Sequence, residues 1–406
     1  MQTRLPETLL ATPEGKRADD ILRSCVHCGF CNATCPTYQV LGDELDGPRG
    51  RIYLIKELLE TDDRQQAKIA QTHLDRCLTC RACETTCPSG VQYGELLEIG
   101  RSVLKSRTTR GWRDALSRRW LTRVLPYPQK FARWAAAGRL VKWLLPRQIA
   151  GQLPRKVEHR DRTPVAGGPY TRKILLLQGC VQRLATPAVN AAVAQLCNAN
   201  EVETMTVDGE GCCGGLHLHL GEDVEALDAM RRNLDALQPI LDEVEYVVST
   251  ASGCGVTLKD YGRLLAHDPK YSALAAEFAG KTIDIAELVG GFNVARKQNF
   301  QRIAWHAPCT LQHGQKLTGP VEQILERAGY ELVAVNDGHL CCGSAGTYSV
   351  LQPDLADQLR TNKLANLTAC DPDVIVTANV GCQTHLQAET DLPVLHWAQL
   401  LVSADA

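Results

Sequence analysis

The pattern of apolar and polar positions divides the 406-residue chain into three parts. The first, residues 1–100, contains helical patterns such as RIYLIKELLE, which follows the turn-forming GPRG at residues 47–50. In the second, residues 101–170, prolines interrupt amphipathic stretches that are rich in tryptophan. From residue 171 onward, short apolar runs alternate with amphipathic segments, which is typical of an α/β fold. The pattern predicts an α+β or α/β protein with a mostly helical first domain, a helical connector and an α/β region.

The α/β region is duplicated. Each half has a single Cys, a Cys-Cys-Gly (CCG) motif after 31 intervening residues, and a Gly-Cys about 40 residues further on. The cysteines of the first half are Cys180, Cys212, Cys213 and Cys254, and those of the second are Cys309, Cys341, Cys342 and Cys382. The halves are offset by 129 residues at the first three positions and by 128 at the fourth. This register predicts two repeats, residues 171–290 and 291–406.

The cysteines of the repeats follow apolar runs that read as buried strands. LLLQG precedes Cys180, IAWHAP precedes Cys309, and YVVSTASG and VIVTANVG lead to Cys254 and Cys382. Ligands of open α/β sheets gather at the carboxyl ends of the strands. We therefore expect the four thiols of each half to converge on one site.

The composition indicates that the eighteen cysteines serve chemistry and not the stability of the fold. A hydrophobic content of 44% can supply a sizeable core, so disulfides are not needed for stability. The amino-terminal residues contain no apolar run of signal-peptide length, and no stretch approaches 18 uninterrupted apolar residues. We therefore expect a cytoplasmic protein, in a reducing compartment where closely spaced cysteines usually bind metal.

Charge is distributed unevenly. Between Arg101 and Lys173 the chain has 19 Lys and Arg against 3 acidic residues, whereas the remainder has 25 basic and 43 acidic residues. The same segment contains four of the six tryptophans. The simplest interpretation is a solvated connector with some core tryptophans. The alternative is a surface that binds an acidic partner or the anionic face of a membrane, where tryptophan favours the interface. No nucleic-acid-binding module accompanies the charge, so we expect no nucleic-acid partner.

The strongest motif occurs twice in the first domain, as CVHCGFCNATCP at residues 25–36 and CLTCRACETTCP at residues 77–88. Cys-x2-Cys-x2-Cys-x3-Cys-Pro is the ferredoxin run for [4Fe-4S] clusters, in which the fourth Cys ligates the other cluster. We therefore predict two [4Fe-4S] clusters with crossed fourth ligands. The first has Cys25, Cys28, Cys31 and Cys87, and the second has Cys77, Cys80, Cys83 and Cys35. Zinc could use the Cys-x2-Cys pairs, but it would leave the third Cys and the proline unexplained.

The chemistry of the CCG repeats is open at this point. All eight repeat cysteines are candidate metal ligands, for a further non-cubane iron–sulfur cluster or for zinc, and a metal-free thiol site is the third alternative. The halves also differ, because Leu177 occupies the position of His306. If only one half is redox-active, we expect it to be the second.

No G-x-G-x-x-G opens a βαβ unit, and no P-loop, Ser-His-Asp set or paired-carboxylate arrangement stands out. We therefore expect no catalytic residue on this chain. One-electron carriers without a hydride acceptor require a partner that oxidises the substrate.

The paired ferredoxin runs, the GDELDGPRGRIYLIKELL between them and the two CCG repeats together resemble the glycolate oxidase (glycolate dehydrogenase) iron–sulfur subunits of bacteria. RCLTCRACETTCPSGV, HLCCGSAGTYSVLQPDLADQLRTNK and VTANVGCQTHL are the most similar pieces. The resemblance implies an oxidoreductase subunit that works beside flavoprotein subunits as glycolate becomes glyoxylate. It also implies a quinone as acceptor and a peripheral position on the cytoplasmic face of the inner membrane.

Related architectures supply the alternatives: a heterodisulfide-reductase-like catalytic subunit, or the iron–sulfur subunit of a lactate or glycerol-3-phosphate dehydrogenase. Heterodisulfide reductases end each CCG motif with Cys-x-x-Cys, whereas Thr257 and His385 occupy the position of the final Cys here. This departure favours electron transfer over direct disulfide chemistry.

Overall fold

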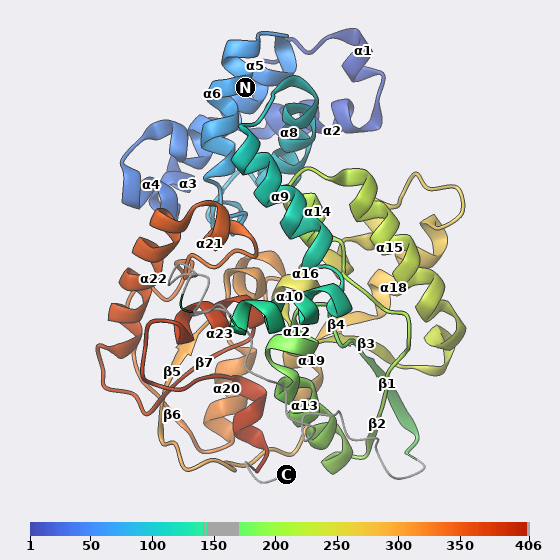
Figure 1. The fold of residues 1–406 in the computed structure, drawn as a ribbon, viewed down its shortest axis with the longest axis vertical. Coiled ribbons are helices and arrows are strands. Elements are labelled where there is room, and N and C mark those ends of the chain that lie inside the picture. Colours follow the sequence, from blue (N-terminus) through green and yellow to red (C-terminus); the bar gives the residue numbers. More distant parts are fainter. Residues whose placement is uncertain (141–142, 144–169, 404–406) are drawn as a thin grey trace.

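A computed structural model describes residues 1–140, 143 and 170–403 of the chain. It confirms the predicted fold class: a helical amino-terminal domain lies against two α/β units, each built on a parallel sheet (Figure 1). In Figure 1 the amino-terminal helices cap one end of the molecule.

The amino-terminal domain is a set of helices around one apolar core. Its elements are α1 (Glu7–Leu10), α2 (Pro13–Ser24), α3 (Phe30–Ala33), α4 (Pro36–Leu41), the 3₁₀ turn η1 (Glu44–Asp46), α5 (Pro48–Glu60), α6 (Arg64–Asp75), α7 (Ala82–Thr85) and α8 (Tyr93–Arg107). Helix α5 begins at a proline, which is favourable in the first helical turn, and its buried face packs on α6 and α8. Helix α8 continues past the predicted boundary at residue 100, because the buried Leu104 extends its apolar face.

The connector forms two further helices, α9 (Trp112–Val124) and α10 (Pro128–Leu140), which run from the amino-terminal domain over the α/β units (Figure 1). Each buries little of its surface: Leu121 and Val124 are the buried residues of α9, and Ala135 is that of α10. The predicted connector otherwise falls largely outside the described residues.

The two sheets share one topology. The strands are β1 (Arg172–Leu176), β2 (Val202–Met205), β3 (Tyr246–Ser249) and β4 (Thr282–Asp284) in the first, and β5 (Arg302–His306), β6 (Glu331–Leu332), β7 (Val374–Thr377) and β8 (Val394–His396) in the second. The orders are β2-β1-β3-β4 and β6-β5-β7-β8, with every pair parallel. Even the register repeats, since Ile174 pairs with Tyr246 as Ile303 pairs with Val374. The apolar runs identified in the sequence are thus the central strands.

Helices flank both sheets. Those of the first repeat are α12 (Gln182–Ala185), α13 (Pro187–Ala199), α14 (Gly215–His219), α15 (Asp223–Leu237), η4 (Gln238–Glu243), α16 (Ser252–Lys259), α17 (Tyr261–Leu264), α18 (Ser272–Lys281) and α19 (Ile285–Val289). Those of the second are η5 (Thr310–Gly314), α20 (Pro320–Arg327), α21 (Tyr348–Leu351), α22 (Pro353–Thr368), α23 (Val380–Gln387) and η6 (Trp397–Leu401).

The repeats are joined by a common core. Leu176 and Val248 of the first sheet and Trp305 and Val376 of the second belong to one buried apolar cluster. The backbone N–H of Ser252 donates to the carbonyl of Ala378 at 3.1 Å, which ties together the loops that follow β3 and β7. The carboxyl ends of the two sheets, which carry the cysteines, are therefore held in a fixed relation.

Candidate functional site

The first ferredoxin run forms one wall of a cavity. Cys25 directly follows α2, Cys28 lies before α3, and Cys31 lies within α3. Cys87, from the second run, follows α7. All four line the same cavity, together with Cys83. His27 and Gly29 both have positive φ, which turns the loop tightly enough to aim its thiols at one centre. The structure thus brings together the four residues predicted for the first cluster.

The second run repeats this geometry. Thr79 and Arg81 have positive φ at the positions equivalent to His27 and Gly29. The cavity that follows is lined by Cys77, Cys80, Cys83 and Cys35, the four residues predicted for the second cluster. Pro48, Cys83 and Tyr93 line both cavities, so the two lie side by side.

The surroundings of the two cavities differ in charge. At the second, Arg51 is 1% exposed and directs its guanidinium toward Cys35 Sγ, at 3.9 Å. The Tyr93 hydroxyl donates to Cys77 Sγ at 3.5 Å. Burial alone would raise the pKa of Cys77, but the charges of Arg51 and Arg101 outweigh it and lower that pKa. At the first cavity, burial raises the pKa of Cys31 to about 11.

Sequence reasoning missed Arg51 and Tyr93. Arg51 sits in the GPRGR sequence two residues after Arg49, whose side chain is 37% exposed and paired with Glu44. A charge-bearing residue on the apolar face of RIYLIKELLE was the available signal, since such a position is rarely charged unless it has a partner.

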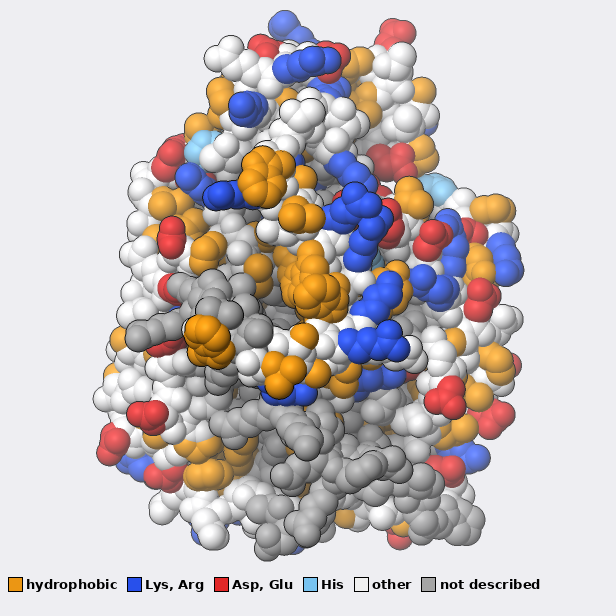
Figure 2. All heavy atoms as spheres, in the orientation of Figure 1, with side chains coloured by type: hydrophobic (Ala, Val, Ile, Leu, Met, Phe, Trp, Pro, Cys, Tyr) orange, Lys and Arg blue, Asp and Glu red, His pale blue; other side chains and the backbone are white. Residues whose placement is uncertain are grey.

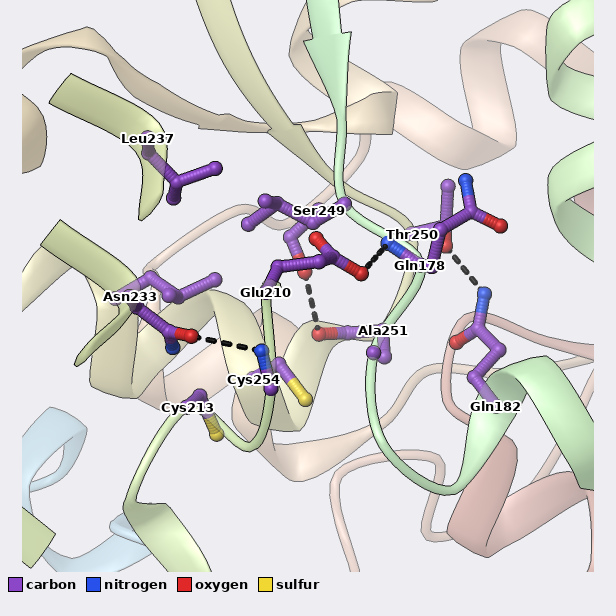
Figure 3. A pocket seen from close by; sticks show the side chains of 14 residues that line it. Gln178, Gln182, Glu210, Cys213, Asn233, Leu237, Ser249, Thr250, Ala251 and Cys254 are labelled. Atoms are coloured by element: carbon purple, nitrogen blue, oxygen red, sulfur yellow. Dashed lines mark hydrogen bonds between the residues drawn. The ribbon is translucent and has the colours of Figure 1, made fainter. Parts of the chain in front are cut away.

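The four thiols of the first repeat form a continuous chain. Cys212 is hydrogen-bonded to Cys180 and Cys213, which raises its pKa well above the usual range, and Cys213 is hydrogen-bonded to Cys254. Figure 3 shows Cys213 and Cys254 beside one another in a pocket at the carboxyl ends of β1 and β3. Its other wall carries Glu210, whose carboxylate accepts a hydrogen bond from the backbone N–H of Gln178 at 2.7 Å (Figure 3).

In the second repeat the thiols also meet. Cys309 and Cys341 have their sulfurs 3.8 Å apart, and Cys342 contacts both Cys341 and Cys382. A ring nitrogen of His306, at the end of β5, lies within 4.8 Å of the sulfurs of Cys342 and Cys382. His385, at the position of the missing final Cys, instead contacts the carbonyl of Ala356 at 3.4 Å. The predicted ligands converge in each half, and among the described residues a histidine nitrogen lies at metal-ligand spacing from the thiols in the second half alone.

The second ferredoxin cavity abuts the second repeat. Cys80 packs against the buried cluster that contains Leu78, Cys309 and Cys341. Thr85 is hydrogen-bonded to His313 at 2.9 Å across the same boundary. The amino-terminal domain is thus fixed against the cysteine site of this repeat.

The connector presents an exposed surface of tryptophan and arginine. Trp112, Leu116, Trp120 and Trp134 are 72%, 60%, 39% and 53% exposed. Trp120 and Trp134 join α9 to α10 through an edge-to-face contact. Figure 2 shows this face, with large apolar side chains gathered over the connector and Lys and Arg side chains at their border. Among the described residues, no helix is long and apolar enough to cross a membrane.

Comparisons with known proteins agree with this division. A model described as a 4Fe-4S dicluster domain matches residues 21–91, and one described as a cysteine-rich domain matches residues 174–259 and 303–387. The glycolate oxidase iron-sulfur subunit of Escherichia coli is 44% identical over all of this chain and 99% of that protein. The probable glycolate oxidase iron-sulfur subunit of Bacillus subtilis is 28% identical over 94% of each.

More distant similarities include a curated relative and a solved structure. Lactate utilization protein A of Bacillus velezensis is 27% identical over 57% of this chain and 99% of that protein. The crystal structure of a hypothetical protein from Helicobacter pylori superposes with a TM-score of 0.53 at 10% identity, over 96% of this chain and 71% of that one. The latter similarity concerns the fold alone.

Proposed function

Because this chain belongs to the family of glycolate oxidase iron–sulfur subunits, we propose that it takes electrons from a flavoprotein subunit and passes them toward a quinone as glycolate is oxidised to glyoxylate. The chain is an iron–sulfur component of an oxidoreductase complex and carries [4Fe-4S] clusters. The flavoprotein partner, the quinone and the ligand assignment are the parts that we propose.

The observation that carries the proposal is the pair of adjoining cysteine cavities. The first is lined by three cysteines of the first run together with Cys83 and Cys87 of the second, and the other is lined by three cysteines of the second run together with Cys35 of the first. Each cavity thus offers the four thiolates that a [4Fe-4S] cluster needs. The first cavity is near the surface, where Cys28 is exposed and Val26 and Phe30 are 68% and 62% exposed. The second lies deeper, against the second repeat. This order suits a path from a docked partner into the protein.

The electron balance requires such a partner. Oxidation of glycolate to glyoxylate releases two electrons and two protons, and a flavin can accept the pair before releasing electrons singly. Iron–sulfur clusters carry one electron at a time, and a quinone takes up two electrons and two protons. The chain therefore links two reactions that each involve an electron pair.

The test uses the chain in complex with its flavoprotein subunits. We expect glycolate to reduce the flavin whether or not this chain is present, and to reduce a soluble quinone only when it is present. A dye that accepts electrons directly from flavin serves as the control for flavoprotein activity. Equal quinone reduction without this chain, or oxidation of glycolate by the isolated chain, would contradict the proposal.

We further propose that the connector holds the complex peripherally on the cytoplasmic face of the inner membrane. Its exposed tryptophans suit the membrane–water interface, and the exposed Arg113, Arg119, Arg123, Lys130 and Arg133 suit anionic headgroups. Binding of this kind lies on the membrane and does not span it.

Charge removal on the connector tests this position. Arg119→Gln combined with Arg123→Gln is expected to weaken binding to vesicles of anionic phospholipid by about 30-fold, because each cation near such a surface contributes ~1 kcal/mol. Vesicle co-sedimentation at low and high salt measures the change. The matched control is Arg296→Gln with Lys297→Gln, two exposed cations of the second repeat, which should leave binding unchanged. An equal loss in both double variants would refute the assignment.

A further inference from the structure

We propose that His306, Cys342 and Cys382 bind a single divalent metal ion, of which zinc is the best match, and that His306 is its nitrogen ligand. This site goes beyond the proposed electron transfer and does not depend on it. The observations that support it are the state of the His306 ring, the spacing of the three donors and the difference between the repeats.

His306 is buried without hydrogen-bond partners. It is 1% exposed at the end of β5, and neither ring nitrogen has a hydrogen-bond partner among the described residues. An unpaired polar group in a protein interior costs about 1–3 kcal/mol, and such groups in native proteins are rare enough to need an explanation. A bound metal ion supplies the missing partner.

The donors are spaced for one ion. A ring nitrogen of His306 and the sulfurs of Cys342 and Cys382 all lie within 4.8 Å of one another. Zinc–sulfur and zinc–nitrogen bonds of ~2.3 and ~2.0 Å place the ligands of a tetrahedral ion less than ~4 Å apart, so a small closure completes the site. The four thiolates of a cubane are attached to four different irons and stand further apart, so the spacing favours a mononuclear centre.

The donor chemistry also fits zinc. Imidazole and thiolate together are a common zinc ligand set, whereas [4Fe-4S] clusters are usually held by thiolates alone. Two thiolates balance the double charge of the ion, so the filled site is neutral and suited to burial. The side-chain amide of Asn379 donates to Cys382 Sγ at 3.7 Å, a contact that orients this ligand. Three protein ligands leave the fourth position for a further donor.

Among its described residues, the first repeat has no histidine nitrogen at metal-ligand spacing from the thiols. Leu177 stands at the position of His306, and the thiols of Cys213 and Cys254 share their pocket with Glu210 and Gln178. The duplication has thus left one half with a thiol-only site and the other with a mixed nitrogen and sulfur site.

The test is the metal content of the full chain, purified without oxygen. We expect about one zinc per chain alongside the iron of the two clusters, and loss of at least tenfold in zinc affinity in His306→Ala, since even an outer-shell partner contributes that much. Cobalt substitution gives a second readout: the visible absorption of tetrahedral Co²⁺ with thiolate ligands should appear in the wild type and change in the variant. His306→Cys, which keeps a donor at the position, should retain the metal if His306→Ala fails to fold.

His385→Gln is the matched control, because His385 is a buried histidine of the same repeat that lies outside the donor group. It should keep zinc and the cobalt spectrum. The proposal is refuted if the wild type contains no zinc, if His306→Ala retains it fully, or if that substitution removes iron instead. Glycolate-driven electron transfer, assayed separately, reports on the proposed function and not on this site.

Discussion

Cys87→Ala is expected to eliminate the cluster of the first cavity while leaving that of the second intact. Cys87 belongs to the second cysteine run, yet it lines the cavity of Cys25, Cys28 and Cys31. Loss of one thiolate leaves an iron without its protein ligand. We expect iron to fall from about eight to about four atoms per chain. Glycolate-dependent quinone reduction should fall by more than ~100-fold. Loss of a group that only contacts a metal ligand costs ~10–100-fold, and Cys87 is itself a predicted ligand.

EPR of the reduced protein decides whether the fourth ligands are crossed. With crossed ligands, the signal that survives in Cys87→Ala is the one that survives in Cys28→Ala and is lost in Cys80→Ala. If each run held its own cluster, Cys87→Ala would resemble Cys80→Ala instead. Cys370→Ala, at a half-buried thiol outside both cavities, is the control and should keep full iron.

Much of this arrangement was predictable from the sequence, because spacing encodes it. The Cys-x2-Cys-x2-Cys-x3-Cys-Pro runs require a tight loop whose thiols face one centre. The positive φ of His27 and Thr79 provides the backbone turn that such a loop needs. The strands before Cys180 and Cys309 were predictable for a similar reason: they are apolar runs buried on both faces. In both cases, a few consecutive residues determine the backbone conformation of their own segment.

The parts that could not be predicted depend on contacts between distant segments. His385 follows Cys382 by three residues and is the obvious substitute for a missing cysteine, but its helix directs it toward Ala356. His306 reaches the thiols because β5 and β7 are neighbours in the sheet, a pairing of residues more than seventy positions apart. The burial of Arg51 likewise follows from α5 packing on α6, where Arg51 donates to the backbone carbonyl of His73 at 2.8 Å.

Arg51→Met is expected to lower the reduction potential of the second cluster. Reduction adds a negative charge to a cluster, so a buried cation nearby favours the reduced form, and its removal must disfavour it. Arg51 is a buried cation in direct contact with a predicted ligand of this cluster. Its guanidinium lies 3.9 Å from Cys35 Sγ and also donates to Thr37 Oγ1 at 3.0 Å. A loss of ~1.4 kcal/mol of this stabilisation corresponds to about 60 mV for one electron, and we expect a decrease of at least that size.

Stability should fall in the same variant, and this has to be separated from the effect on potential. Arg51 pairs with the fully buried Asp46, and breaking a buried ion pair from one side typically costs about 3–5 kcal/mol. Arg76 at 2.8 Å and His73 at 3.0 Å also contact Asp46, so the carboxylate keeps partners and the loss should fall at the lower end. Arg51→Lys, which keeps the charge but not the forked hydrogen bonds, should lose stability with a much smaller change in potential.

Potentiometric titration followed by EPR, on protein with full iron content, measures the potential of each cluster. Arg49→Met is the control, because Arg49 lies at the first cavity, where its side chain is 37% exposed and already paired with Glu44. It should leave the second cluster unchanged. An unaltered potential in folded, fully loaded Arg51→Met would show that Arg51 serves the packing of α5 against α6 and does not tune the cluster. A selective decrease at the second cluster would show that this buried guanidinium raises the potential of the second cluster and not that of the first.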